Sequence, residues 1–220
     1  MHLTLFDLDN TLLEGDSDVE WARHLIDLGV LDRATYEARN EQFFADYRAG
    51  TLDIQAFLAF QLAPLASHRR QQLDAWHHDF MQSRIRPMMS TGARAAVQRH
   101  LAAGDLVAVV TATNSFVTAP ICRAFGIEHL VATIAEEVDG RFTGRASGTP
   151  CFQAGKIERT QAWLASLGKT WGDFRTTTFY SDSRNDLPLL EMVSQPVAVR
   201  PDAVLRATAE ARGWTIVEAF

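Results

Sequence analysis

The sequence predicts an α/β protein with a doubly wound parallel sheet and a helical block inserted after the first strand. An apolar, β-prone run, Leu3 to Phe6, opens the chain, residues 15–86 carry helical patterns only, and strands then alternate with helices. Such alternation is typical of a parallel sheet covered by helices on both faces. Because the first strand precedes the helical block, we expect an α/β core formed by residues 1–14 and 87–220, and a helical cap formed by residues 15–86.

The composition is that of an ordinary globular protein. The 220 residues are 47% hydrophobic and 22% charged, and the net charge is −6, which leaves ample material for a core. The only lysines are Lys156 and Lys169, and no basic stripe of the kind that binds nucleic acid is present. Two cysteines are too few for a disulfide framework, and no apolar stretch approaches the ~18 residues of a membrane span. We therefore expect a cytoplasmic protein that binds neither nucleic acid nor membrane.

Two carboxylates, Asp7 and Asp9, follow the first predicted strand. In an extended segment, side chains two residues apart emerge on one face. They would lie just beyond the carboxyl end of a buried strand, where open α/β sheets bind ligands. A metal cation would offset their repulsion, since hard cations are bound through oxygen ligands. A plain Asx-type turn at Asp9-Asn10 explains the same residues without a ligand.

The inserted block has the pattern of four helices. Ser17 and Glu20 have the spacing of a capping box, which begins the first helix, and glycines end the first two. The amphipathic stripes of the four helices suffice for a small bundle. We expect these helices to run from Ser17 to before Gly29, from Asp32 to Ala49, from Asp53 to before Pro64, and from near Ser67.

The remainder of the chain alternates between the two kinds of element. The run at 106–110 is continuously apolar, as in strands buried on both faces of a parallel sheet, and Asp139-Gly140 is typical of a hairpin turn. We expect strands at 106–110, 130–134, 176–181, 197–199 and 214–218, and helices at 91–103, 115–125, 154–167, 184–193 and 202–211.

Polar residues that could take part in binding or catalysis recur at the ends of later predicted strands. Thr111 ends strand 106–110 before a helix start, and a hydroxyl beside free helix N–H groups suits an anion. Asp182 stands at the end of strand 176–181, with Asp186 one turn further on. Lys156 opens a helix, where a cation opposes the helix dipole.

Each of these residues also has an ordinary structural explanation. Thr113 or Ser115 can be the N-cap of the helix that follows Thr111. Ser183 and Asp186 have capping-box spacing, which accounts for Asp186 and leaves Asp182 unexplained. A lysine on a helix surface is usually solvated.

The order of these four motifs resembles the haloacid dehalogenase superfamily of phosphohydrolases. The motifs are Phe6-Asp7-Leu8-Asp9-Asn10-Thr11, Val109-Val110-Thr111, Lys156, and Ser181-Asp182-Ser183-Arg184-Asn185-Asp186. The helical insert after the first motif is similar to the cap of the phosphoserine-phosphatase-like branch, subfamily IB. The resemblance covers nearly the whole chain.

The resemblance implies a phosphomonoester hydrolase that works through an aspartyl-phosphate. Asp7 would attack phosphorus, and Asp9 would protonate the leaving alcohol and later take a proton from water. Thr111 and the N–H groups after it, beginning with Ala112, would hold the phosphoryl oxygens, and Lys156 would stabilise the charge that develops on them.

The resemblance also implies a Mg²⁺ ion. An oxygen of Asp7, the backbone carbonyl of Asp9 and the carboxylate of Asp182 would hold it, with Asp186 bound directly or through water. Four carboxylates near one phosphate are tolerable when a divalent cation and Lys156 offset their charge.

The expected substrate is a small phosphorylated metabolite that carries an amine, such as histidinol phosphate or phosphoserine. Asp16 matches a position where phosphoserine phosphatases carry a glutamate that faces the substrate amine, and Arg48 is a candidate for a substrate carboxylate. Thr111-Ala112-Thr113 replaces the Ser-Gly-Gly of those enzymes, which argues against strict phosphoserine specificity. Two rival functions remain: a phosphomutase or phosphotransferase of the same superfamily, and a non-catalytic capped binding protein.

Overall fold

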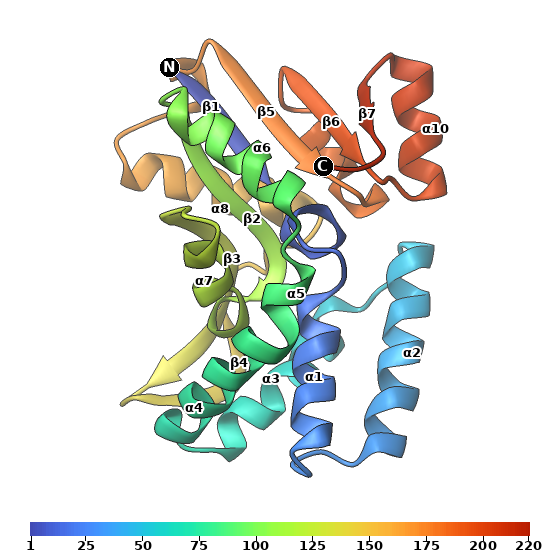
Figure 1. Cartoon of the computed structure of the whole chain (residues 1–220), viewed down its shortest axis with the longest axis vertical. Coiled ribbons are helices and arrows are strands. Elements are labelled where there is room, and N and C mark those ends of the chain that lie inside the picture. The colour runs from blue at the N-terminus through green and yellow to red at the C-terminus, as the bar shows by residue number, and fades with distance from the viewer.

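A seven-stranded sheet has its central strands in the upper half of the molecule and a hairpin edge that extends to the lower left, and most of the inserted helices lie in the lower half (Figure 1). The computed structural model describes residues 1–220. The strands are β1 (His2–Phe6), β2 (Leu106–Asn114), β3 (His129–Val138), β4 (Arg141–Ser147), β5 (Thr176–Ser181), β6 (Gln195–Val199) and β7 (Thr215–Val217). The helices are α1 (Ser17–Asp27), α2 (Arg33–Ala49), α3 (Ile54–Ser67), α4 (Arg70–Phe80), α5 (Arg86–Met88), α6 (Thr91–Ala102), α7 (Ser115–Ala124), α8 (Ala154–Ser166), α9 (Leu187–Leu190) and α10 (Ala203–Arg212). Short helical turns are η1 (Leu8–Leu12), η2 (Met81–Ile85), η3 (Trp171–Asp173) and η4 (Arg184–Asp186).

The order of the strands confirms the predicted doubly wound sheet. The order is β4-β3-β2-β1-β5-β6-β7, and all neighbours are parallel except β3 and β4. The first strand lies between β2 and β5, so that Phe6 faces Val109 on one side and Tyr180 on the other. The carboxyl ends of these three strands therefore meet at the centre of one sheet edge, where open α/β sheets bind ligands.

The two faces of the sheet carry separate hydrophobic layers. Alternate residues of the central strands point to opposite faces: Val107 and Val109 pack on the side of α6 and α7, whereas Ala108 and Val110 pack on the side of α8, α9 and α10. Burial on both faces explains why the central strands are continuously apolar in sequence.

Residues 15–86 form helices beyond the carboxyl ends of the strands (Figure 1). Trp21 of α1, Leu62 of α3 and Phe80 of α4 belong to the same buried cluster as the α6–α7 face of the sheet. In contrast, Phe43 is the only buried residue of α2. None of the helices of the protein is both long and apolar enough to cross a membrane.

The first helix begins at Ser17 as predicted, but its N-cap lies one residue earlier than the capping-box pattern indicates. The N-cap is Asp16, whose Oδ1 accepts a hydrogen bond from the Val19 backbone N–H at 3.0 Å. Ser17 is the first helical residue, and its hydroxyl has no hydrogen-bond partner. Both residues are good N-caps, so the sequence pattern alone favoured the residue that completed a capping box.

The third helix was predicted to stop before Pro64. It instead continues to Ser67. A proline inside a helix removes one backbone N–H and so leaves the carbonyl four residues earlier without its helical partner. Here that carbonyl belongs to Phe60, and the Tyr36 hydroxyl of α2 donates to it at 3.4 Å. Packing against a neighbouring helix therefore compensates for a break that the local sequence predicts.

Several other boundaries differ from the predictions. The second strand continues through Thr111 to Asn114, and Asn114, rather than Thr113 or Ser115, caps α7 by accepting from the Val117 N–H. The fourth helix begins at Arg70, and the helix predicted at 184–193 is a short turn followed by one turn of α9. The hairpin is confirmed: Asp139 and Gly140 both have positive φ, as a tight hairpin turn requires.

Candidate active site

Three polar strand ends meet at the centre of the sheet edge. Asp7 follows β1, Thr111 lies in the last part of β2, and Asp182 follows β5. The Thr11 hydroxyl lies 3.3 Å from Asp7 Oδ2 and 3.1 Å from Asp182 Oδ1. Acids 175 positions apart in the sequence are thus joined through one hydroxyl, because their strands are neighbours.

Lys156 supplies the positive charge of this cluster. Its Nζ lies 2.8 Å from Asp7 Oδ1 and 2.7 Å from Asp186 Oδ2, and the Lys156 side chain is only 3% exposed. The alternative interpretation, a solvated surface lysine, is therefore wrong. Burial alone would lower the pKa of Lys156, but Asp186 and Asp7 outweigh it and hold the pKa well above its ordinary value.

The acids of the cluster carry more negative charge than one lysine offsets. Burial, only partly offset by Lys156, raises the pKa of Asp7 to about 7, and the charge of Asp186 adds to this rise. Burial and the charges of Asp7 and Asp186 raise the pKa of Asp182 well above its ordinary value. These shifts mean that the site favours a second cation or protons on its carboxyl groups.

Hydroxyl and backbone donors fix the remaining groups. Asp9 accepts from the Ser17 N–H at 2.6 Å and from the Thr113 hydroxyl at 2.8 Å. Burial and the charge of Asp16 nevertheless raise the pKa of Asp9 to about 6. Thr111 Oγ1 accepts from the Thr113 N–H at 3.2 Å, which leaves the hydroxyl hydrogen of Thr111 available to a ligand.

The donor set suits a hard divalent cation. Asp7 and Asp182 present carboxylate oxygens on both sides of Thr11, and oxygen ligands are those that Mg²⁺ binds. No three His, Cys, Asp or Glu side chains stand together as a ready set of metal ligands, so a backbone carbonyl or water would have to complete the coordination. Asp186, one of the expected ligands, instead accepts from Lys156 and from the Ser181 hydroxyl at 2.7 Å each.

A cavity of about 90 Å³ opens above the acids. Its floor contains most of the predicted site, and its walls come from α1, α2, α3 and the loop before α8. Lys156 is its only cationic residue, and no arginine lines it. Its lining also includes the acids Asp7, Asp9, Asp16, Asp18 and Asp186, the threonines Thr111 and Thr113, the amides Asn40 and Gln61, and the aromatic Phe43, Tyr47 and Phe152.

The two predicted substrate-binding residues lie further out. A larger cleft of about 1390 Å³ adjoins the cavity and is lined by both Asp16 and Arg48. Asp16 also lines the inner cavity, although one of its oxygens caps α1. Arg48 lines only the outer cleft, where its guanidinium lies 4.7 Å from the centre of the Phe44 ring. The structure therefore brings Asp16, but not Arg48, to the catalytic motifs.

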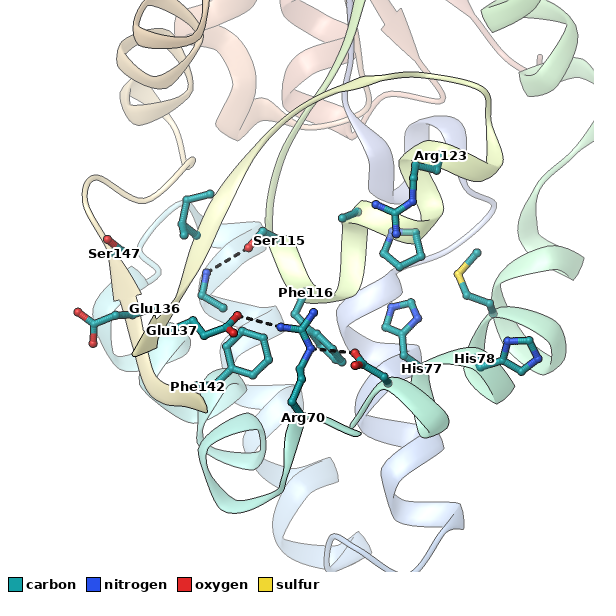
Figure 2. Close-up of a pocket in the computed structure, with 16 residues that line it drawn as sticks. Arg70, His77, His78, Ser115, Phe116, Arg123, Glu136, Glu137, Phe142 and Ser147 are labelled. Carbon is teal, nitrogen blue, oxygen red and sulfur yellow. Dashed lines mark hydrogen bonds and ion pairs between the residues drawn. The ribbon is translucent and has the colours of Figure 1, made fainter. Parts of the chain in front are cut away.

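A separate pocket of about 700 Å³ lies between α4, α7 and the β3–β4 hairpin (Figure 2). Arg70 stands in it between Asp74 and Glu137, at 2.9 and 2.8 Å. His77 Nε2 is 2.9 Å from the carbonyl oxygen of Val117. Arg70 and His77 therefore already have partners, and none of the four motif acids or Lys156 lines this pocket.

Among the cavity residues that the sequence does not predict as site residues are Asp18, Asn40 and Gln61. Asp18 lies in the first turn of α1, where an acid is also favoured by the helix dipole. Asn40 and Gln61 lie on α2 and α3, and nothing in one sequence distinguishes a cavity-facing amide on a cap helix from a solvated one. Only the packing of the helices over the sheet edge reveals them.

The family of the chain follows from comparison of its sequence. The model of the haloacid dehalogenase-like hydrolases matches residues 4–191, a span that contains all four motifs. The chain therefore belongs to the haloacid dehalogenase-like hydrolases.

Relatives narrow the class of activity. A histidinol-phosphatase of Neisseria meningitidis serogroup C is 48% identical over 98% of both chains. A phosphoserine phosphatase of Mycobacterium tuberculosis is 34% identical over 96% of this chain and 68% of its own length. The chain is accordingly an enzyme, a phosphatase of this family.

Solved structures agree in fold. A protein of unknown function from Bordetella pertussis Tohama I is 50% identical and has a TM-score of 0.94 over 100% of this chain and 99% of its own. A substrate-bound phosphoserine phosphatase is 21% identical, with a TM-score of 0.71 over 98% of this chain and 92% of its own. At that identity the second likeness shows the fold alone.

We predict that Gly155→Ala disturbs the active site through the backbone. A Cβ at Gly155 would lie 2.1 Å from the carbonyl oxygen of Pro150, so either the loop or the start of α8, with Lys156, must move. The expected result is a loss of roughly 2 kcal/mol in the free energy of unfolding together with a fall in phosphatase activity. Chemical denaturation and a phosphate-release assay measure the two effects.

Gly172→Ala is the matched control for this prediction. A Cβ there meets only Thr170 Oγ1 at 3.7 Å, an ordinary contact. We expect a change within about 0.5 kcal/mol and unaltered activity. Equal stability and activity of the two variants would show that the approach of Gly155 to Pro150 does not position Lys156.

Proposed function

We propose that the protein is a Mg²⁺-dependent phosphomonoesterase that acts through an aspartyl-phosphate on Asp7. The observation that carries this proposal is the buried contact of Lys156 with Asp7 and Asp186 at the floor of the cavity. A lysine held there can stabilise negative charge on phosphoryl oxygens beside the nucleophile.

The two half-reactions use the residues as follows. An Asp7 oxygen attacks phosphorus, the bond from phosphorus to the leaving oxygen breaks, and Asp9 gives that oxygen a proton. Asp9 then takes a proton from water as the water oxygen attacks phosphorus and the bond to Asp7 breaks, which releases inorganic phosphate. The raised pKa of Asp9, about 6, suits a group that alternates between acid and base near neutral pH.

Residues of β2 and Lys156 are proposed to bind the phosphate group of the substrate. The free hydroxyl hydrogen of Thr111 and the N–H of Ala112 are assigned to the phosphoryl oxygens, opposite Lys156. Asp7, Asp182 and the Asp9 carbonyl would hold Mg²⁺, with Asp186 reached through water, and the bound ion would supply charge neutralisation and polarisation of the phosphoryl group.

We propose that the substrate is a phosphorylated amino alcohol without a carboxylate, as in histidinol phosphate. Carboxylates of Asp9, Asp16 and Asp18 surround the cavity, and their charge favours a cationic amine. A substrate carboxylate would find no free cation there, because Lys156 already faces two acids. The relative that is 48% identical is named a histidinol-phosphatase, which agrees with this choice.

The cavity wall also suits a five-membered ring with one donor and one acceptor. The Gln61 amide nitrogen donates to Asn40 Oδ1 at 3.4 Å, so the Gln61 carbonyl oxygen and the Asn40 amide nitrogen remain free. A neutral imidazole offers the complementary N–H and ring nitrogen. The ring of Phe43 lines the same cavity and supplies apolar contact.

We further propose that residues 15–86 are a cap on the core formed by 1–14 and 87–220, and that α2 is its moving part. The other long cap helices share a buried cluster with the sheet, whereas α2 buries only Phe43. At its end, the Tyr47 hydroxyl donates to Ser183 at 3.0 Å, and the Asn185 side chain donates to the Tyr47 carbonyl at 3.1 Å. Closure of α2 would exclude water during transfer.

Both cysteines are free thiols, which fits a cytoplasmic location.

We expect Asp7→Asn to abolish turnover of a generic aryl phosphate, because a neutral amide cannot form the aspartyl-phosphate. Release of inorganic phosphate is the measurement, and it also separates a hydrolase from a mutase. Turnover near that of the unmodified protein would refute the assignment of the nucleophile.

Removal of divalent metal is expected to abolish activity, and added Mg²⁺ to restore it. The acids then lose the cation that their excess negative charge requires. Asp182→Asn should raise the Mg²⁺ concentration needed for half-maximal activity by about tenfold or more. Metal-independent hydrolysis by the purified enzyme would contradict the proposed role of Asp182.

Histidinol phosphate should be hydrolysed with a kcat/KM at least about tenfold above that of phosphoserine, since an unpaired carboxylate costs on the order of 1.4 kcal/mol or more. The two substrates are compared by phosphate release under identical conditions. A preference for phosphoserine would show that a cation, such as Arg48 of the outer cleft, reaches the substrate carboxylate.

A further inference from the structure

Two acidic residues lie at the start of α1, and only one of them caps the helix. Asp16 caps the helix through the Val19 N–H. Asp18 caps nothing: it accepts a long hydrogen bond, 3.4 Å from Asn114 Nδ2 to its Oδ1, and the Thr113 hydroxyl lies near enough to lower its pKa. The nearby Thr113 hydroxyl donates to Asp9 instead, at 2.8 Å.

Asp18 is nevertheless buried. Its residue is 5% exposed, and it lines the inner cavity. An acid in the first turn of a helix interacts favourably with the helix dipole, but that effect operates equally well at the surface and does not account for burial. A buried carboxylate with one weak partner is costly unless a cation meets it.

No cationic side chain that lines the cavity is free to meet Asp18. The only cationic residue of the cavity is Lys156, which already contacts Asp7 and Asp186. Desolvation, followed by the charges of Asp16 and Asp9, raises the pKa of Asp18 well above its ordinary value. The carboxyl group therefore lacks, in the protein alone, the positive partner that its position requires.

We propose that Asp18, rather than the helix-capping Asp16, binds the ammonium group of the substrate and determines the selectivity for amine-bearing phosphates. Asn114 holds Oδ1 from the core side, so the ammonium group meets Oδ2, and its three N–H donors allow further contacts with the cavity wall. The inference rests on the proposed phosphatase function and adds the residue that recognises the amine of the substrate.

The test compares Asp18→Asn on phosphates with and without an amine. The kcat/KM for histidinol phosphate and O-phosphoethanolamine should fall by about 100-fold, mainly through KM, because a neutral amide does not pair with a cation. The kcat/KM for glycerol phosphate, which has no amine, should fall by less than about tenfold, so that the preference for amines falls at least about tenfold. Asp79→Asn is the matched control: it removes the same charge from an exposed position on α4 that does not line the cavity, and it should leave the preference unchanged.

Stability provides an independent readout. Since Asp18 is a buried, poorly paired charge, Asp18→Asn and Asp18→Ala should melt at the same temperature as the unmodified protein or higher. A lower melting temperature with equal losses on all substrates would mean that Asp18 is structural, and it would overturn the inference. Failure of the unmodified enzyme to release phosphate from any substrate would instead refute the proposed function.

Discussion

The arrangement of the candidate active site depends on one buried ammonium group, that of Lys156. Lys156 contacts Asp7 and Asp186 in a position where its side chain is almost fully buried. Bringing three charged groups out of water is costly, and removal of one partner from such a cluster leaves the others uncompensated. The contact therefore requires that the end of β1, the start of α8 and the turn after β5 keep fixed positions relative to one another.

The fold meets this requirement through the sheet. Parallel pairing of β1 with β2 and β5 sets the strand ends beside each other, and apolar layers on both faces hold the strands in register. A shift of one residue would exchange the two faces of β1 and expose Phe6 or Leu5 to the wrong layer. At α8, the close approach of Gly155 to the Pro150 carbonyl fixes the point from which Lys156 enters the cluster. The chemistry is thus positioned by backbone packing rather than by flexible side chains.

Much of this arrangement could be predicted from the sequence because its signals are local. Acids that follow an apolar run mark strand ends, and the parallel topology then brings Asp7, Thr111 and Asp182 to one edge. Helix boundaries that depend on tertiary contacts could not be predicted: Pro64 is tolerated because Tyr36 satisfies the carbonyl that it frees. The sequence likewise could not decide between Asp16 and Ser17 as the N-cap, since both side chains can accept a hydrogen bond from a backbone N–H of the first turn. The cavity wall, with Asn40 and Gln61, depends on how helices of the insert pack over the sheet, which one sequence does not record.

The charge of the cavity offers a physical route to selectivity. Specificity is a difference between two binding free energies, and an unpaired charge against the wrong ligand contributes to it as much as a contact with the right one. In the proposed mechanism Lys156 and Mg²⁺ would meet the phosphate, while the remaining wall of the cavity is acidic and lacks a second basic residue. A ligand with an ammonium group relieves repulsion among Asp9, Asp16 and Asp18, whereas one with an added carboxylate increases it. In the proposed function, exclusion of phosphorylated amino acids would thus follow from the same carboxylates that would attract a phosphorylated amino alcohol, without an additional recognition element.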